Sequence, residues 1–183
     1  SANNWTPSGG LSRTAGVDDC SVIDTPTNNF CTWNALATIS ANTYTKGNLT
    51  NTNSSYNYPA RGSISVSSGK WYFEWQKDSG TDVGNVGVCR ASNNFGTTAS
   101  DWSSSSDFWV YLAGTGNKFN GTWPGTAYGS AYTTELIGVA LDLDNGAIYF
   151  SRSGTWQNSG DPTSGSSKTG AAYGNLSGET VTP

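Results

Sequence analysis

The titratable side chains of this chain limit the chemistry that it can perform. Its 183 residues include no histidine, so neither a Ser-His-Asp triad nor a Cys-His pair can form. A glycosidase needs two carboxylates about 5–10 Å apart across the scissile bond. The glutamates, Glu74, Glu135 and Glu179, lie far apart in the sequence, and no Glu-x-Asp-x-x-Glu strand pattern is present. We therefore expect neither catalysis nor a cofactor.

A short acidic motif resembles the start of a calcium-binding loop. Asp142-Leu-Asp-Asn-Gly146 places two carboxylates two positions apart, with an amide directly after the second. The full loop requires a bidentate glutamate about seven positions later, where this chain has Ser151 and Arg152. The motif is therefore better explained as the end of a strand followed by a turn, and we predict no metal site.

The chain has three cysteines, Cys20, Cys31 and Cys89, and their positions indicate whether a disulfide is expected. Cys89 alternates with Val86 and Val88, so we predict that it is a small buried side chain in a strand. Cys20 and Cys31 can pair, but the odd count and the lack of a framework spacing favour free thiols. Assembly in a reducing compartment fits this pattern best.

Aromatic side chains are the strongest candidates for binding. Large apolar side chains in alternating strand positions are predicted to be core: Trp71, Trp75, Phe108, Val110 and Phe150. Other rings lie in segments rich in Gly, Ser and Thr, where they must either pack onto the domain or meet a partner. Glycans stack on such rings while Asn, Asp and Ser bind their hydroxyls. The candidate ligand-binding residues are Trp102, Trp123, Tyr128, Tyr132 and Trp156.

The composition indicates an all-β domain. Charged residues make up 12% of the chain and aromatic residues 13%, and there are 23 glycines. Gly, Ser, Thr and Asn disfavour helix interiors, and no long segment has apolar residues at helical spacing. The net charge of −4 comes without a basic stripe, so we expect no nucleic-acid partner. The apolar runs are also too short to insert into a membrane.

The clearest element is a β-hairpin between Glu135 and Arg152. Apolar residues alternate from Ile137 to Leu143, which is typical of a strand with one face in a core. Asn145-Gly146 suits a two-residue turn that tolerates positive φ. This turn predicts that Leu143 lies opposite Ile148 and that Leu141 lies opposite Phe150.

Further strands are predicted at intervals of 8–15 residues, which suggests a sandwich or jelly roll. They cover residues 30–34, 48–52, 63–67, 70–76, 82–90, 107–112, 117–120 and 171–176, and loops cover 121–134 and 153–175. Residues 1–29 are predicted to be a loop-like segment leading into one domain, residues 30–183. That domain ends at Val181-Thr-Pro183 without a predicted closing strand, so we expect the molecule to continue or a partner to complete the sheet.

Three blocks together resemble a SPRY domain. Gly69-Lys-Trp-Tyr-Phe-Glu-Trp75 is similar to the family's Gly-x-x-Tyr-x-Glu strand, and Val86-Gly-Val-Cys-Arg90 to its "VGV" strand. The hairpin Ile137–Phe150 resembles its "GD-x-IGV-x-LD" motif, with Glu135-Leu136 where many members have Gly-Asp. The resemblance covers roughly residues 60–155. It implies a bent, concanavalin-like antiparallel β-sandwich whose loops bind protein or glycan partners without catalysis, and it transfers no fixed ligand residues.

The flanks resemble segments of bacteriophage tail-fibre and other virion proteins. These segments include Asn4-Trp-Thr-Pro7, Ala15–Asp18, Asp24–Asn34 and, after the hairpin, Ser153–Pro162. Three functions are therefore open. The first is an adhesin on a virion appendage that binds a host surface glycan or protein, in a homo-oligomer such as the trimer usual in fibres. The second is a decoration or assembly domain that binds another virion subunit. The third is a cellular SPRY adaptor.

Overall fold

The computed structural model describes residues 30–37, 42–53, 59–79, 84–93 and 102–183. Regular structure in these residues is almost entirely β, with two single-turn 3-10 helices, η1 (Gln157–Ser159) and η2 (Gly165–Ser167). The strands are β1 (Asn42–Thr45), β2 (Thr50–Asn53), β3 (Lys70–Trp75), β4 (Val86–Arg90), β5 (Phe108–Tyr111), β6 (Asn117–Phe119), β7 (Thr126–Ala127), β8 (Ile137–Asp142), β9 (Ala147–Arg152), β10 (Thr155–Trp156) and β11 (Val181–Thr182).

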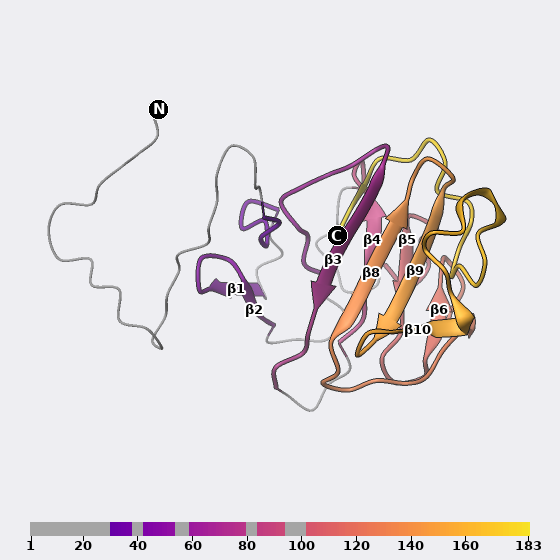
Figure 1. The fold of residues 1–183 in the computed structure, drawn as a ribbon. Helices are drawn as coiled ribbons and strands as arrows, with labels where there is room; N and C mark the ends of the chain where they lie inside the picture. Colours follow the sequence, from indigo (N-terminus) through magenta and orange to yellow (C-terminus); the bar gives the residue numbers. More distant parts are fainter. Residues whose placement is uncertain (1–29, 38–41, 54–58, 80–83, 94–101) are drawn as a thin grey trace, which may run out of the picture.

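Two antiparallel sheets form the body of the domain. One has the order β10-β9-β8-β3, and the other has the order β11-β4-β5-β6-β7. The first sheet lies across the second in Figure 1, while β1 and β2 form a separate hairpin to one side. This arrangement confirms the predicted all-β antiparallel sandwich.

The main core lies between the two sheets. One face of β3, β4, β5, β8, β9 and β11 supplies it, as the period of two requires. The five-stranded sheet contributes Val86, Val88, Trp109, Tyr111 and Val181, and the four-stranded sheet contributes Ile137, Val139, Leu141, Ile148 and Phe150. A second buried cluster, made by Cys89, Phe108, Val110, Leu112 and Phe119, covers the outer face of the five-stranded sheet.

The β8–β9 hairpin is confirmed, but its predicted register is wrong by two residues. Leu141 lies opposite Ile148, and Val139 lies opposite Phe150. The connection spans residues 143–146, and only Gly146 has a positive φ, of 72°. Asp142 accepts a hydrogen bond from the Asn145 backbone N–H, at 3.1 Å, which favours a wider turn than a type I′ pair. Since the shift is an even number, each side chain stays on its predicted face.

Three predicted strands are reduced to single bridges. Residues 30–34 contribute only the bridge between Trp33 and Gly62, and residues 63–67 only the bridge between Val66 and Val181. Residues 171–176 likewise contribute one bridge, between Ile148 and Tyr173. The predicted loops contain the two-residue strands β7 and β10, which the sequence pattern did not indicate.

The end of the chain also differs from the prediction. Val181–Thr182, expected to lack a strand, forms β11, which pairs with β4 through Val181–Arg90 and Thr182–Cys89. Trp71, predicted to be core, is 48% exposed. Cys89 is buried and free, as predicted, and Cys31 is also free. Cys20, the expected loop at 1–29 and residues 82–83 of the predicted strand at 82–90 lie outside the described residues.

Candidate functional site

The five rings selected from the sequence are divided among three environments. Tyr128 and Tyr132 are buried in the core between the sheets, and Trp156 is half-buried against the outer face of the four-stranded sheet. Trp102 and Trp123 are in contact on the outer face of the five-stranded sheet. The structure therefore does not bring all five rings to one surface.

Tyr128 and Tyr132 have a structural role. Tyr132 donates a hydrogen bond to the backbone carbonyl of Tyr111 at 2.8 Å, and its ring lies 4.9 Å from that of Tyr111. Tyr128 packs edge-on against Phe150, with ring centroids 6.1 Å apart. Burial raises the pKa of Tyr128 to about 12. The two rings attach the loop before β8 to both sheets, so they are not available to a ligand.

Trp123, Trp102 and Phe119 form an aromatic platform on the five-stranded sheet. Phe119, from β6, is fully buried, and Trp102 packs edge-on above it with ring centroids 5.4 Å apart. Trp123 packs edge-on against Trp102 at 6.1 Å and remains 58% exposed. The platform therefore continues a buried cluster into an exposed indole ring.

The loop that carries Trp123 is held in place on both sides. Asn120 donates two hydrogen bonds, to the carbonyls of Ser106 at 2.7 Å and Phe108 at 2.8 Å. Asn117 donates to the carbonyl of Pro124 at 3.1 Å. Gly125 has a φ of 78°, and a Cβ there would lie 2.2 Å from the carbonyl oxygen of Lys118. Only glycine fits so close to β6, so the backbone beside Trp123 is held in place, while the Trp123 ring itself packs against Trp102 and Phe119.

A second aromatic pair, the exposed Tyr72 and the half-buried Trp156, lies on the opposite sheet, and the sequence prediction missed Tyr72. Tyr72 of β3 is 56% exposed and packs edge-on against Trp156, with ring centroids 6.4 Å apart. Its hydroxyl donates to Glu74 at 2.8 Å. Its ring lies over Gly138, where a Cβ would come within 2.5 Å of the Tyr72 hydroxyl. Tyr72 alternates with the inward-facing Phe73, and that alternation was the available signal.

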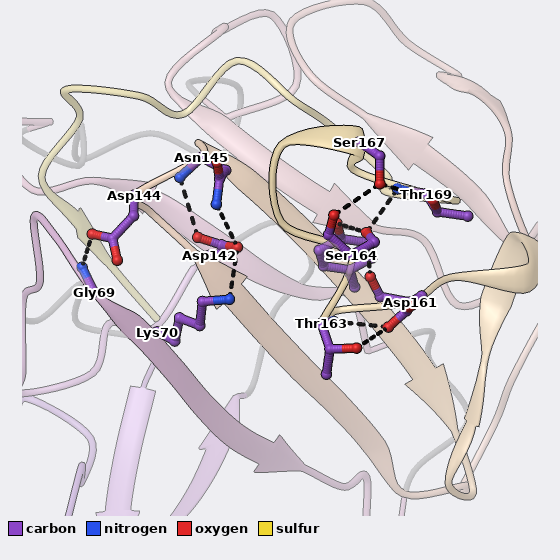
Figure 2. Close-up of polar contacts among 11 residues, drawn as sticks. Gly69, Lys70, Asp142, Asp144, Asn145, Asp161, Thr163, Ser164, Ser167 and Thr169 are labelled. Carbon is purple, nitrogen blue, oxygen red and sulfur yellow. Dashed lines mark hydrogen bonds and ion pairs between the residues drawn. The ribbon is translucent and has the colours of Figure 1, made fainter.

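The motif that resembled a calcium loop is a structural turn. Asp142 is buried, its Oδ1 accepts from the Asn145 backbone N–H, and its Oδ2 accepts from the Asn145 side chain at 2.9 Å and pairs with Lys70 at 3.2 Å. Asp144 accepts from the Gly69 N–H at 2.7 Å, which connects the turn to β3 (Figure 2). Burial alone raises the pKa of Asp142, but the Asn145 hydrogen bonds and the Lys70 ammonium outweigh it and lower the pKa.

Hydroxyl groups order the long loop after β10. Asp161 accepts from the backbone and side chain of Thr163, at 2.8 and 2.6 Å, and these bonds lower its pKa. Ser164 donates to the Asp161 carbonyl at 2.6 Å and accepts from the Thr169 N–H at 2.9 Å (Figure 2). Because these groups bond mainly to each other, they stabilise the loop rather than aim at a ligand.

Glu135 is expected to make the stability of the domain depend on pH. Hydrogen bonds from the Thr133 backbone and from Arg152 lower its pKa from the ordinary 4.5 to about 2. A carboxyl whose pKa is lowered by folding stabilises the folded state above its unfolded pKa, and this stabilisation is lost as the pH falls through its folded pKa. The free energy of unfolding should therefore exceed that of Glu135→Gln above about pH 4.5, and the difference should shrink towards pH 2. Urea denaturation at several pH values measures this difference in the free energy of unfolding. A difference that stayed constant from pH 7 to about pH 2 would contradict the assignment.

Within the described residues, no group of three or more Asp, Glu and Cys side chains is placed to hold a metal ion. No helix of that part of the chain is long and apolar enough to cross a bilayer.

The two packed antiparallel sheets define a β-sandwich, in which β3, β4 and the β8–β9 hairpin carry the three sequence blocks described above. Residues 70–173, more than half of the chain, match the family profile of the SPRY domain, and the chain belongs to this family. The structure is similar to the crystal structure of the SPRY domain of human HERC1, with a TM-score of 0.50 and 20% sequence identity over 68% of this chain and 71% of that one. No curated protein is significantly similar in sequence. SPRY domains are protein-interaction modules, so the fold and the family support partner binding.

Proposed function

We propose that this SPRY domain is the recognition module of a phage tail fibre or another virion appendage, located on the extracellular surface of the particle. Its partner is a glycan or protein on the host surface. The virion setting is supported by the resemblance of segments between Asn4 and Asn34, and of Ser153–Pro162, to segments of such proteins. Most of the residues between Asn4 and Asn34 lie outside the described residues.

The observation that carries this proposal is the exposed Trp123 ring on an anchored loop. A ring that is already fixed loses little conformational freedom on binding. The adjoining segment is rich in hydroxyl groups, with Ser104, Ser106 and Thr122 exposed. An exposed indole ring suits the apolar face of a sugar, and exposed hydroxyl groups in the same and the neighbouring loop suit its hydroxyls, so a glycan is the favoured partner.

Trp123→Ala is expected to weaken host binding by roughly thirtyfold or more, because removing a central aromatic anchor costs about 2 kcal/mol or more. The measurement is binding of the full 183-residue chain to an array of bacterial surface glycans and to host cells. Trp156→Ala is the matched control, because it removes an indole ring from the other sheet. Near-UV circular dichroism of both variants checks that they remain folded.

Each other outcome assigns the function differently. Loss of binding only in Trp156→Ala would move the recognition surface to the four-stranded sheet. Binding to host cells but to no glycan would identify a protein receptor. If neither the unaltered chain nor any variant bound host material, the adhesin proposal would fail.

A structural role in the virion is the second candidate, and the same exposed indole supports it, because a neighbouring subunit can cover Trp123. In that case a map of the assembled particle should show Trp123 and Trp102 buried at a contact between subunits. Open solvent around both rings in that map would remove the support for this role.

A further inference from the structure

Strand β3 forms one edge of the four-stranded sheet, and none of the described strands pairs with its outer side. One hydrogen bond shows which backbone groups face β8: the Leu143 N–H donates to the carbonyl of Gly69 at 3.0 Å. In an antiparallel ladder, hydrogen-bonded residues alternate along the strand. The backbone groups of Gly69, Trp71 and Phe73 therefore point towards β8, and those of Lys70, Tyr72 and Glu74 point away from the sheet.

The three residues with outward backbone groups also form a self-complementary series of side chains. Lys70, Tyr72 and Glu74 share the outer face of the sheet and are all exposed. If a second copy of β3 runs antiparallel beside the first with Tyr72 on the two-fold axis, Lys70 of each copy lies opposite Glu74 of the other. The same register places all three outward residues opposite outward residues, as a hydrogen-bonded ladder requires.

We propose that two copies of this chain associate by antiparallel pairing of β3 with β3, joining their four-stranded sheets into one continuous sheet. A contact of this kind is isologous, since each residue meets its counterpart through the same two-fold axis. The proposal specifies the oligomeric state, a dimer, and the register in which the two β3 strands pair. The proposal is independent of the Trp123 platform, which lies on the other sheet.

Both faces of the paired strands would gain contacts. On the outer face the two Tyr72 rings meet at the axis, and two Lys70–Glu74 ion pairs flank them. On the other face Trp71, which is 48% exposed in the single chain, lies opposite Phe73 of the second copy. Cross-strand aromatic pairs and opposite-charge pairs are the contacts that stabilise such ladders.

The existing contacts of these side chains leave room for the new ones. Lys70 already contacts Asp142 at 3.2 Å, and its ammonium has three donor hydrogens. Glu74 accepts from Tyr72 through Oε1, and a carboxylate has further acceptor sites.

The charges also favour this register over one in which the second strand is shifted by two residues. A shift by two residues keeps the faces but places Glu74 opposite Tyr72, so neither ion pair forms. Edge strands that avoid association commonly carry charges that repel a second copy, whereas Lys70 and Glu74 attract one under two-fold symmetry.

A charge reversal tests the interface in the full-length chain. Analytical ultracentrifugation should show that the unaltered protein is a dimer. The dimer of Glu74→Lys should have a dissociation constant at least about tenfold higher, because two ion pairs become two like-charge pairs. Asp78→Lys, at an exposed residue beyond β3, makes the same charge change and should leave the dimer intact. A monomer or trimer for the unaltered chain, or equal weakening by both variants, would overturn the proposal.

Cross-linking tests the register. In a background with Cys20 and Cys31 changed to Ser, Tyr72→Cys should form a disulfide-linked dimer under mild oxidation. Hydrogen-bonded partners on the axis have Cα atoms about 5.5 Å apart, within the range of a disulfide. Glu74→Cys is the control on the same face of the same strand, and its two copies would be about 13 Å apart along the ladder. Cross-linking of both variants alike, or of Glu74→Cys alone, would contradict this register.

Discussion

Phe150→Ala is expected to lower the free energy of unfolding by about 3–5 kcal/mol, because it opens a cavity in the centre of the core. Phe150 is fully buried on β9. Its ring is stacked with that of Tyr111 from the other sheet, with centroids 5.4 Å apart, and it meets Tyr128 edge-on. Because this ring contacts both the opposite sheet and the loop before β8, we expect little of the cavity to close by relaxation.

Urea denaturation followed by far-UV circular dichroism measures this loss, and Trp123→Ala is the matched control. Trp123 is larger than Phe150 but 58% exposed, so its removal should cost only about 1 kcal/mol. If both variants lost equal stability, the assignment of Phe150 to the core and of Trp123 to the surface would be wrong. The same control shows that a binding defect in Trp123→Ala does not come from unfolding.

The sequence predicted the fold well where alternation alone decides the structure. In the hairpin from Ile137 to Phe150, the apolar period of two assigns each side chain to a face whatever the turn does. The register required more, because it depends on whether Asp142 bonds to the Asn145 backbone, and a side-chain hydrogen bond of this kind leaves no trace in hydropathy. Short pairings such as β7 and β10 depend on neighbouring strands and have no pattern of their own.

The candidate site was predictable only in part. Tyr128, Tyr132 and Trp123 occur in one glycine-rich stretch, and nothing in their local sequence separates them. Burial separates them in the structure, because the first two reach back between the sheets while Trp123 sits beyond Phe119 at the rim. The exposure of Trp71 was missed for a different reason. Trp71 alternates with the core-facing Phe73 and Trp75 and so fitted a core pattern, but β3 is at an edge of its sheet, and sheet order is not encoded in the strand itself.

The two proposed surfaces lie on different sheets, and this separation has a functional consequence. Pairing through β3 would leave both Trp123 platforms open, because they belong to the five-stranded sheet. A dimer would then present two recognition surfaces, and weak binding at each would combine through multivalency. The loss of host binding in Glu74→Lys should therefore be larger for cells than for a single soluble ligand.

Among the glycines that the structure describes, Gly87 of β4 is the one where an added Cβ would come closest to another atom. Gly87 pairs with Val110 of β5. A Cβ at this position would lie 2.1 Å from the carbonyl oxygen of Trp109 and 2.8 Å from the Cα of Val110. Both atoms are backbone, so no rotamer change can relieve the overlap. Gly87→Ala must push β4 and β5 apart, and we expect it to cost about 3 kcal/mol or more.

Gly154→Ala separates this steric effect from the effect of glycine's backbone freedom. Gly154 has a φ of 81°, but a Cβ there would meet no atom within 4 Å. Only the left-handed backbone conformation opposes alanine at this site, which costs about 1 kcal/mol. Urea denaturation should therefore rank Gly87→Ala well below Gly154→Ala in stability. An equal loss would mean that β4 and β5 can separate at little cost, and the sheet under the Trp123 platform would be less rigid than its geometry implies.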